Sequence, residues 1–291
     1  YGESGGQVGD TGTICTQDAS LRITNTKKPL DKLFSHVCEV VTGAVQKGAE
    51  ATIRVDAERR QKIVRNHTAT HLLQAALQKI LGEHIKQAGS LVEPERLRFD
   101  FTHFSPVTTE EIIKIEEEVN AQIRANAVVE SQVMAADDAQ AAGAMALFGE
   151  KYGDEVRVIS VGDYSMELCG GTHASASGDI GLFRIISEGG IAAGVRRIEA
   201  VTGDGALAQV HQQQQTLQRL ASLVKSDPQQ LETRLVKVLE RQKELERDLA
   251  TLESRLKAGQ ADDIMNQAVD VAGVKVLAAQ VEPTDAKGLR D

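Results

Sequence analysis

The pattern of apolar and polar positions divides the chain into four zones. Residues 1–55 alternate glycine-rich turns with short β-type runs, which indicates a small β-barrel or sheet. Residues 56–205 mix helix-periodic segments with strand-like ones, which indicates an α+β domain. Residues 206–258 favour helix almost throughout, and residues 259–291 hold only the start of a further domain.

Local start and stop signals predict individual elements within these zones. Helices are expected at 57–82, where Gly82 suits a C-terminal cap, and at 108–126, where the preceding SPVTTEE suits a helix start. Strands are expected where β-branched and aromatic residues alternate with polar ones, at 34–41, 51–56, 96–101, 155–162, within 183–201 and at 274–281.

The third zone carries a coiled-coil stripe. Apolar residues recur on alternating steps of three and four, interrupted only by Gln242, at Leu231, Leu235, Val238, Leu245, Leu249, Leu252 and Leu256. Ser226 or Asp227 can cap a new helix and Pro228 lies near its first position, which predicts a bend. The stripe must be covered by the preceding 206–225 helix or by another chain, and the restart favours an antiparallel hairpin.

Composition and charge limit the classes of function. With 291 residues and 41% hydrophobic residues, the chain is long enough for two or three domains. A net charge of −9 argues against a generally cationic nucleic-acid coat, so any RNA contact must be local. No apolar run approaches the roughly 18 residues that a membrane span needs, and no signal peptide is present, so a soluble protein without a membrane partner is expected.

The cysteines and the first residues indicate the setting of the chain. Cys15, Cys38 and Cys169 are too few and too scattered for a disulfide framework, which predicts a reducing, cytoplasmic location with at least one free thiol. The chain opens within a glycine-rich segment and without an initiator methionine. It is interpreted as a fragment of a longer protein.

Two short segments together predict a metal site. His67 and His71 lie four residues apart, on one face of the expected helix. Cys169 and His173 are separated by a Gly-Gly pair that allows a tight loop. Either pair alone fits an ordinary structural role, but together they form a donor set suited to zinc. The remaining histidines lack such partners and are interpreted as structural or exposed: His36, His84, His103 and His211.

Five segments in sequence order resemble the editing domain of alanyl-tRNA synthetases. They read ESGGQVGDTG, RNHTATHLL, QAGSLVEPERLRFDF, ELCGGTHASASGDIG and GGIAAGVRRIEAVTG, and the resemblance extends over residues 1 to about 205. The helical zone and the tail resemble the linker and the start of the C-terminal domain of these enzymes. We expect no aminoacylation domain within these 291 residues, and therefore do not expect this fragment to activate alanine.

The resemblance implies a fold and a reaction. The implied fold is α+β, with a small β-barrel subdomain packed on an editing core of the threonyl/alanyl-tRNA synthetase type and followed by a helical, coiled-coil-like linker. The implied reaction is an aminoacyl-tRNA deacylase activity, hydrolysis of the ester in Ser-tRNA(Ala) or Gly-tRNA(Ala), within a parent alanine-tRNA ligase. Alanine tRNA is then the partner. The implied Zn²⁺ ligands are His67, His71, Cys169 and His173.

Several roles stay open at this stage. A four-ligand zinc is structural, whereas three ligands and an open position allow catalysis, and the sequence does not decide between them. Cys169 is a catalytic candidate through the metal. Gln87 matches a family glutamine near the editing pocket and is a candidate for positioning water or a hydroxyl, although it also fits an ordinary surface glutamine. Gln7 is a candidate substrate-binding residue that can reach the pocket from the first subdomain.

Charged residues on the expected strands have two interpretations as well. Arg98 and Asp100 share one face of a strand and can form an ion pair or take part in catalysis. Arg196 or Arg197 is a candidate for contacting RNA phosphate, with Arg196 taken as the substrate-binding residue, while the other is interpreted as a solvated arginine.

Two rival functions remain alongside editing within a synthetase. One is a free-standing trans-editing protein with the same chemistry, which the helical stripe and the further domain after it disfavour. The other is a zinc-stabilised module that binds tRNA or protein without turnover. Self-association through residues 206–258, or through a C-terminal domain outside the fragment, is also possible.

Overall fold

The computed structural model is a mixed α+β protein, as the sequence predicts. It describes residues 1–30, 33–145, 154–266 and 268–278. The chain divides into two compact units, Tyr1–Gln212 and Gln213–Asp291. Within the described ranges, none of the helices has both the length and the apolar character required to cross a membrane.

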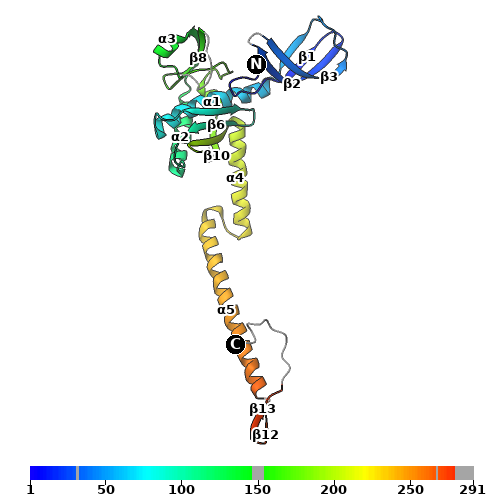
Figure 1. Cartoon of the computed structure of the whole chain (residues 1–291), viewed down its shortest axis with the longest axis vertical. Coiled ribbons are helices and arrows are strands. Elements are labelled where there is room, and N and C mark those ends of the chain that lie inside the picture. Colours follow the sequence, from blue (N-terminus) through cyan, green and yellow to red (C-terminus); the bar gives the residue numbers. More distant parts are fainter. Residues whose placement is uncertain (31–32, 146–153, 267, 279–291) are drawn as a thin grey trace. The chain divides into compact units, whose positions relative to one another are not determined.

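The first sheet of unit 1 is antiparallel and open, with strand order β3-β2-β1-β4 (Figure 1). Its strands are β1 (Gly12–Cys15), β2 (Ala19–Leu30), β3 (Leu33–Gly43) and β4 (Thr52–Val55). The strands expected at 34–41 and 51–56 are confirmed. Closure into a barrel is not seen among the described residues, where β3 and β4 are edge strands. A barrel closes only when its two edge strands pair with each other, and the described strands β3 and β4 are not paired.

The second sheet carries the core of unit 1. Its antiparallel strand order is β10-β11-β6-β5, with β5 (Gln87–Val92), β6 (Leu97–Thr102), β10 (Phe183–Ala192) and β11 (Val195–Thr202). Alternate residues of β6, Leu97, Phe99 and Phe101, are fully buried against helices α1 (Ala57–Leu81) and α2 (Thr109–Ala125). The same cluster includes Leu72, Leu73 and Leu77 of α1, so this core fixes the helix that carries the paired histidines.

Both helices begin and end where the sequence indicates. Asp56 caps α1, because its side chain accepts a hydrogen bond from the Arg59 backbone N at 3.0 Å, and Gly82 ends the helix with φ 119°. Thr108 and Glu111 form a capping box at the start of α2. These caps make the helix ends predictable from local residues alone.

A third, smaller sheet was not fully anticipated. It has strand order β7-β8-β9, with β7 (Val129–Ala135), β8 (Glu155–Val161) and β9 (Ser165–Leu168). The short helix α3 (Ala136–Ala141) contacts β7 and β8, whereas η1 (Ser177–Ile180) contacts α1 and α2. Only β8 is predicted by the sequence pattern. The sheet matters for function because β9 ends at Leu168, immediately before Cys169.

The second unit is mostly helical. It includes the end of α4 (Gly203–Leu223), the short η2 (Pro228–Gln230), α5 (Leu231–Met265) and the hairpin of β12 (Val269–Val271) with β13 (Val274–Val276). Asp227 and Pro228 restart the helix, as predicted. The strand expected at 274–281 is confirmed only for β13, and its last three residues lie outside the described ranges.

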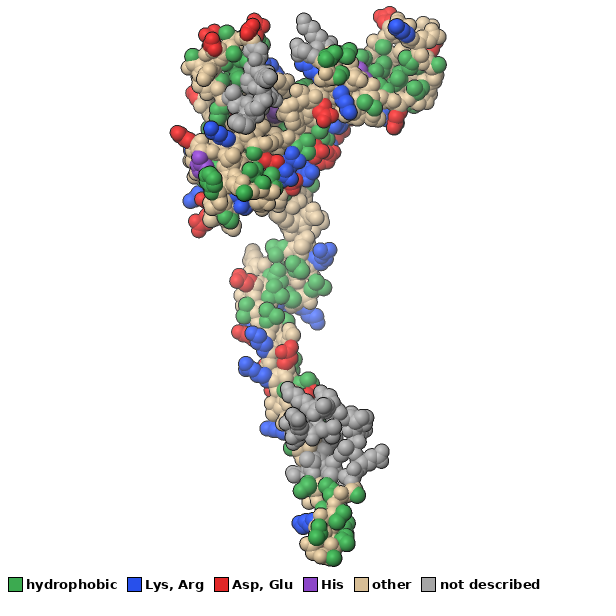
Figure 2. All heavy atoms as spheres, in the orientation of Figure 1, with side chains coloured by type: hydrophobic (Ala, Val, Ile, Leu, Met, Phe, Trp, Pro, Cys, Tyr) green, Lys and Arg blue, Asp and Glu red, His purple; other side chains and the backbone are tan. Residues whose placement is uncertain are grey.

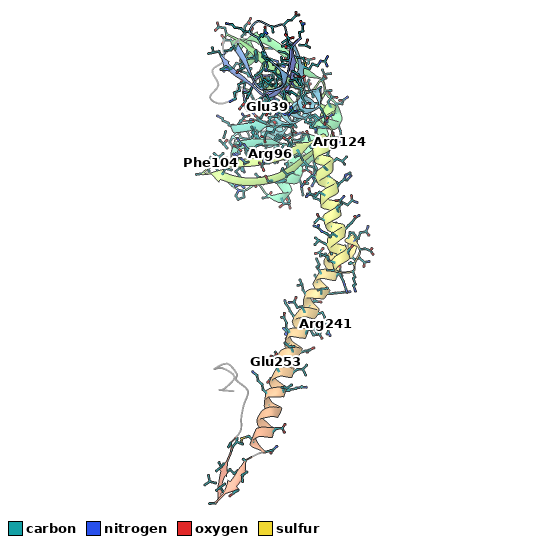
Figure 3. The ribbon with its side chains drawn as sticks, turned by 90° about the vertical axis from the view of Figure 1, so that its right-hand side faces the viewer. Glu39, Arg96, Phe104, Arg124, Arg241 and Glu253 are labelled. Carbon is teal, nitrogen blue, oxygen red and sulfur yellow. The ribbon has the colours of Figure 1, made fainter. Side chains whose placement is uncertain are left out.

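The coiled-coil stripe of α5 is not covered within its own unit. Leu231 is 7% exposed, but Leu245 is 51% and Leu252 is 62% exposed, and side chains project around the helix at Arg241 and Glu253 (Figure 3). These stripe positions are exposed among the described residues, and the hairpin stays a prediction. A proline restart fixes where a helix begins but not the angle at which it continues, so the sequence could not settle this point. Self-association through the stripe stays a prediction.

Candidate metal centre

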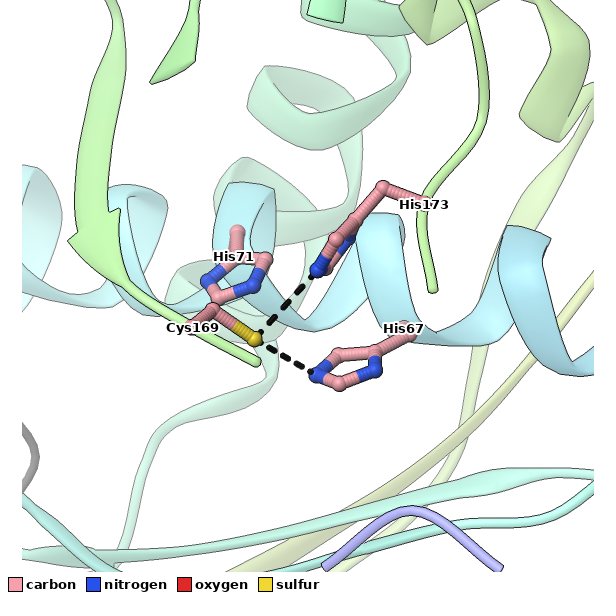
Figure 4. A group of neighbouring side chains, drawn as sticks. All are labelled: His67, His71, Cys169 and His173. Carbon is pink, nitrogen blue, oxygen red and sulfur yellow. Dashed lines mark hydrogen bonds between the residues drawn. The ribbon is translucent and has the colours of Figure 1, made fainter. Parts of the chain in front are cut away.

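Four side chains from two elements meet in unit 1 (Figure 4). His67 and His71 lie one turn apart on α1, while Cys169 and His173 lie on the loop that follows β9. One ligand atom from each residue lies within 4.8 Å of the others. His67, His71 and Cys169 are buried and His173 is partly buried. The two segments that the sequence singled out therefore converge on one site.

The distances fit a tetrahedral metal ion. The Cys169 Sγ lies 3.4 Å from His67 Nε2 and 3.3 Å from His173 Nε2. Zinc bonds of about 2.3 Å to sulfur and 2.0–2.1 Å to nitrogen at a tetrahedral angle place such atoms about 3.5 Å apart. These two distances match zinc coordination, while the four ligand atoms as a set lie within 4.8 Å of one another.

A glutamine fixes the tautomer of His67. Gln7 Oε1 accepts hydrogen bonds from the Thr172 backbone N at 2.9 Å and from His67 Nδ1 at 2.6 Å. An amide oxygen only accepts, so His67 Nδ1 carries the proton and, in the neutral ring, Nε2 presents its lone pair to the cluster. Gln7 is fully buried and its nitrogen donates to Thr172 Oγ1 at 3.0 Å.

The other two histidines are oriented in the same way. The Glu167 carboxylate accepts from His71 Nδ1 at 2.5 Å. Thr68 Oγ1 donates its proton to the Val64 carbonyl oxygen at 3.0 Å, so at 3.4 Å it can only accept from His173 Nδ1. All three rings are thus held by Nδ1, and His67 and His173 turn Nε2 toward the cysteine sulfur, an arrangement typical of metal ligands.

One buried nitrogen of the cluster lacks a hydrogen-bond partner. His71 Nε2 is buried and makes no hydrogen bond with any described residue. Such an orphan is costly unless a proton donor, a water or a metal satisfies it. The Glu167 carboxylate, which is 1% exposed, and a Cys169 thiolate would together place two negative charges here, which a divalent cation balances. The donor set therefore fits a divalent metal.

The local charges favour ligand forms of the cysteine and of one histidine. Burial acts to raise the pKa of the Cys169 thiol, but the charge that His67 carries when protonated and the contacts of the sulfur with His173 and His67 outweigh it and lower this pKa to about 2. Burial lowers the pKa of His173 to about 3, which keeps its ring neutral. Burial also acts to lower the pKa of His71, but the charge of Glu167 prevails and raises it to about 10, so without a metal this ring is protonated and a bound metal must displace its Nε2 proton.

The ligand loop packs directly on His67 through a glycine. A Cβ added at Gly171 would lie 2.1 Å from His67 Cε1 and 2.9 Å from Gln7 Oε1, so only glycine fits there. Arg157 Nη1 donates to the Gly171 carbonyl oxygen at 2.5 Å and holds the loop from β8. Gly170, the neighbouring residue, has no such constraint, since its added Cβ would meet no atom within 4 Å.

The structure brings only some of the candidate residues together. Gln7 joins the cluster, whereas Gln87 begins β5 opposite Phe101, and no hydrogen bond among the described residues links it to the ligands. Arg196 pairs with Glu188, with Arg196 Nη2 2.9 Å from Glu188 Oε2. Their functional roles stay predictions.

The expected strand ion pair is present and belongs to a larger group. Arg98 Nε lies 3.6 Å from Asp100 Oδ2. Arg197 makes the closer contact, with two hydrogen bonds of 2.6 and 2.8 Å to the same carboxylate. Neither arginine is therefore simply solvated.

Sequence reasoning missed the residues that orient the ligands. Glu167 lies two residues before Cys169 and Thr68 lies one residue after His67, so both were close to the recognised segments. The sequence alone does not distinguish a polar residue that orients a histidine from one that lies on the surface. Only the fold shows that Glu167 and Thr68 are buried beside the rings.

Comparisons with known proteins agree with this geometry. The family described as Threonyl and Alanyl tRNA synthetase second additional domain matches residues 156–199, which include Cys169 and His173. The family described as tRNA synthetases class II (A) matches residues 1–59, which include Gln7.

Similar full-length relatives are alanine–tRNA ligases. The chain is 50% identical over 291 residues to those of Xanthomonas campestris pv. campestris and Stenotrophomonas maltophilia, and 49% identical over 290 residues to that of Idiomarina loihiensis. Each alignment covers 100% of this chain and 33% of the relative. The chain thus spans about a third of the length of the curated relatives it matches.

Proposed function

The chain belongs to the alanyl-tRNA synthetase family, and from that membership we propose that it performs post-transfer editing. In this reaction a water attacks the carbonyl carbon that joins a wrong amino acid to the 3′ end of alanine tRNA. The ester bond to the ribose oxygen breaks, and that oxygen takes a proton. The observation that carries the proposal is the convergence of three oriented imidazoles and one cysteine next to the buried Gln7.

We propose zinc as the ion of this centre, held by His67, His71, Cys169 and His173. Sulfur and imidazole donors are the set that zinc prefers in proteins. When bound with an open position, zinc supplies Lewis acidity toward a carbonyl oxygen or lowers the pKa of a bound water. With all four side chains bound it holds helix and loop together, whereas the open position requires that only three of them bind at a time.

The residues around the ligands keep the site in a single geometry. Gln7 ties the glycine-rich first segment to the ligand loop through Thr172, while Glu167 holds His71. An aminoacyl ester is already activated, so fixed groups that orient a water and the carbonyl supply much of the rate. Gln87 and Arg196 are retained as proposed contacts to the reacting group and to tRNA phosphate.

The proposed substrates are seryl and glycyl esters of alanine tRNA. An apolar synthetic pocket rejects an added hydroxyl poorly, whereas a second site that hydrogen-bonds this hydroxyl discriminates strongly. We therefore expect Ser-tRNA(Ala) to be hydrolysed much faster than Ala-tRNA(Ala). Glycine is smaller than alanine, so the synthetic pocket does not exclude it by size.

Deacylation assays test this function directly. The 291-residue chain is incubated with seryl, glycyl or alanyl alanine tRNA, and the remaining ester is measured over time. We expect wild type and the exposed-cysteine control Cys15→Ser to hydrolyse the seryl ester rapidly. With Cys169→Ser, we expect hydrolysis at about the rate in buffer alone. Equal hydrolysis of seryl and alanyl esters, or none above buffer, would refute editing and leave a tRNA-binding module as the alternative.

A further inference from the structure

The second unit contains a polar groove at the junction of α4 and α5. The groove has a volume of about 880 Å³, and its lining includes three basic residues, Lys225, Arg234 and Lys237, and one acid, Asp227. The chain as a whole has a net charge of −9. This junction is therefore a local positive site on an acidic protein, and Lys and Arg side chains are visible near it in Figure 2.

The basic groups of the groove are largely free to meet a ligand. Arg234 Nε donates to the Val224 carbonyl oxygen at 3.0 Å, which caps the end of α4, but its terminal nitrogens make no hydrogen bond with any described residue. Lys225 and Lys237 likewise have no acidic partner within the described ranges. Arg234 and Lys237 lie three residues apart on α5 and share one face of that helix.

Lys225 occupies a backbone position that normally selects glycine. Its φ is 53°, in the left-handed region, and its backbone N donates to the Ser222 carbonyl oxygen at 3.1 Å as α4 ends. A non-glycine residue there is strained, so a lysine at this position disfavours the fold relative to glycine. The conformation of Lys225 therefore agrees with, but does not by itself establish, another use for its side chain.

We propose that this groove binds the phosphate backbone of tRNA. Three unneutralised cations against one acid match the chemistry of a phosphodiester chain, and the hydroxyls of Ser222 and Ser226 in the lining can donate hydrogen bonds to phosphate oxygens. The inference rests on the proposed editing of a tRNA, because that function supplies the polyanion. It assigns the α4–α5 junction the role of holding the tRNA body, which is a different role from that of the metal centre.

Binding of uncharged alanine tRNA to the full chain tests the groove. Affinity is measured by fluorescence anisotropy between about 50 and 200 mM salt for wild type, Lys225→Gly and Lys237→Gln. Each variant is expected to weaken binding about fivefold at low salt and to reduce the slope of log affinity against log salt by about 1. Lys243→Gln removes the same charge from α5 outside the groove, and we expect it to bind as wild type does.

The design separates the groove from folding and from catalysis. Glycine accepts the left-handed conformation, so Lys225→Gly should keep or raise the stability of the helical unit, which circular dichroism checks. Deacylation of a serylated acceptor-stem minihelix should be unchanged in both groove variants, because the minihelix lacks the tRNA body. Equal tRNA affinity in wild type and groove variants, an equal loss in Lys243→Gln, or no binding by wild type would overturn the assignment, whatever the outcome of the deacylation assay.

Discussion

The packing of Gly171 on His67 gives the sharpest structural prediction. An added methyl group would lie 2.1 Å from His67 Cε1 and 2.4 Å from Nδ1, so the ring must move by more than 1 Å to restore van der Waals contact. The displaced ring loses its hydrogen bond to Gln7, about 1 kcal/mol, and the overpacked site costs a further ~1–3 kcal/mol. Gly171→Ala should therefore lower the free energy of unfolding by about 2–4 kcal/mol.

The same displacement should damage metal binding more than stability. His67 Nε2 is proposed as a ligand, so a shift of its ring should weaken zinc binding at least about 100-fold in a competition titration against a chromogenic chelator. Gly170→Ala is the matched control, because its methyl group meets no atom within 4 Å. If Gly171→Ala retained wild-type zinc affinity, or if Gly170→Ala were equally damaged, the packing argument would be refuted.

Three further predictions concern single interactions. Glu167→Gln removes the charge that holds His71, so zinc affinity should fall about 10–100-fold while the secondary structure persists in circular dichroism. Thr108→Ala removes the cap of α2 and should cost about 1 kcal/mol in chemical unfolding. The Thr108 hydrogen bonds lower the pKa of Glu111, so the ionised carboxylate stabilises the fold above its ordinary pKa. The difference in free energy of unfolding between wild type and Thr108→Ala should therefore shrink as pH falls through the lowered pKa. Leu249→Lys should abolish any self-association of the exposed α5 stripe seen in sedimentation at high chain concentration.

Local sequence signals predicted much of the secondary structure of unit 1. Asp56, Gly82 and Thr108 act through hydrogen bonds and backbone angles of their immediate neighbours, so helices α1 and α2 begin and end close to where expected. The two residue pairs of the candidate metal site were also predictable, because their spacing within two short segments reflects a helix turn and a glycine loop. These features depend on residues that are close in sequence.

Features that depend on distant residues could not be predicted. The sequence does not show that Glu167 lies beside His71, since 96 residues separate them. It also does not show that Gln7 is fully buried between His67 and Thr172, where it orients a ligand. The open first sheet and the exposed α5 stripe could not be predicted for the same reason. Sheet closure and helix pairing depend on the tertiary arrangement and not on periodicity.

We propose that one metal ion bound by His67, His71, Cys169 and His173 supports deacylation of mischarged alanine tRNA. The most direct measurement is a titration of zinc into the metal-depleted, folded chain, with the initial rate of Ser-tRNA(Ala) hydrolysis recorded at each step. We expect the metal-free chain to react at about the rate of buffer alone. The rate should then rise linearly with added zinc and saturate at about one equivalent per chain. Full activity in the metal-depleted chain, or a rate that does not saturate near one equivalent of zinc, would contradict a role of this metal in deacylation.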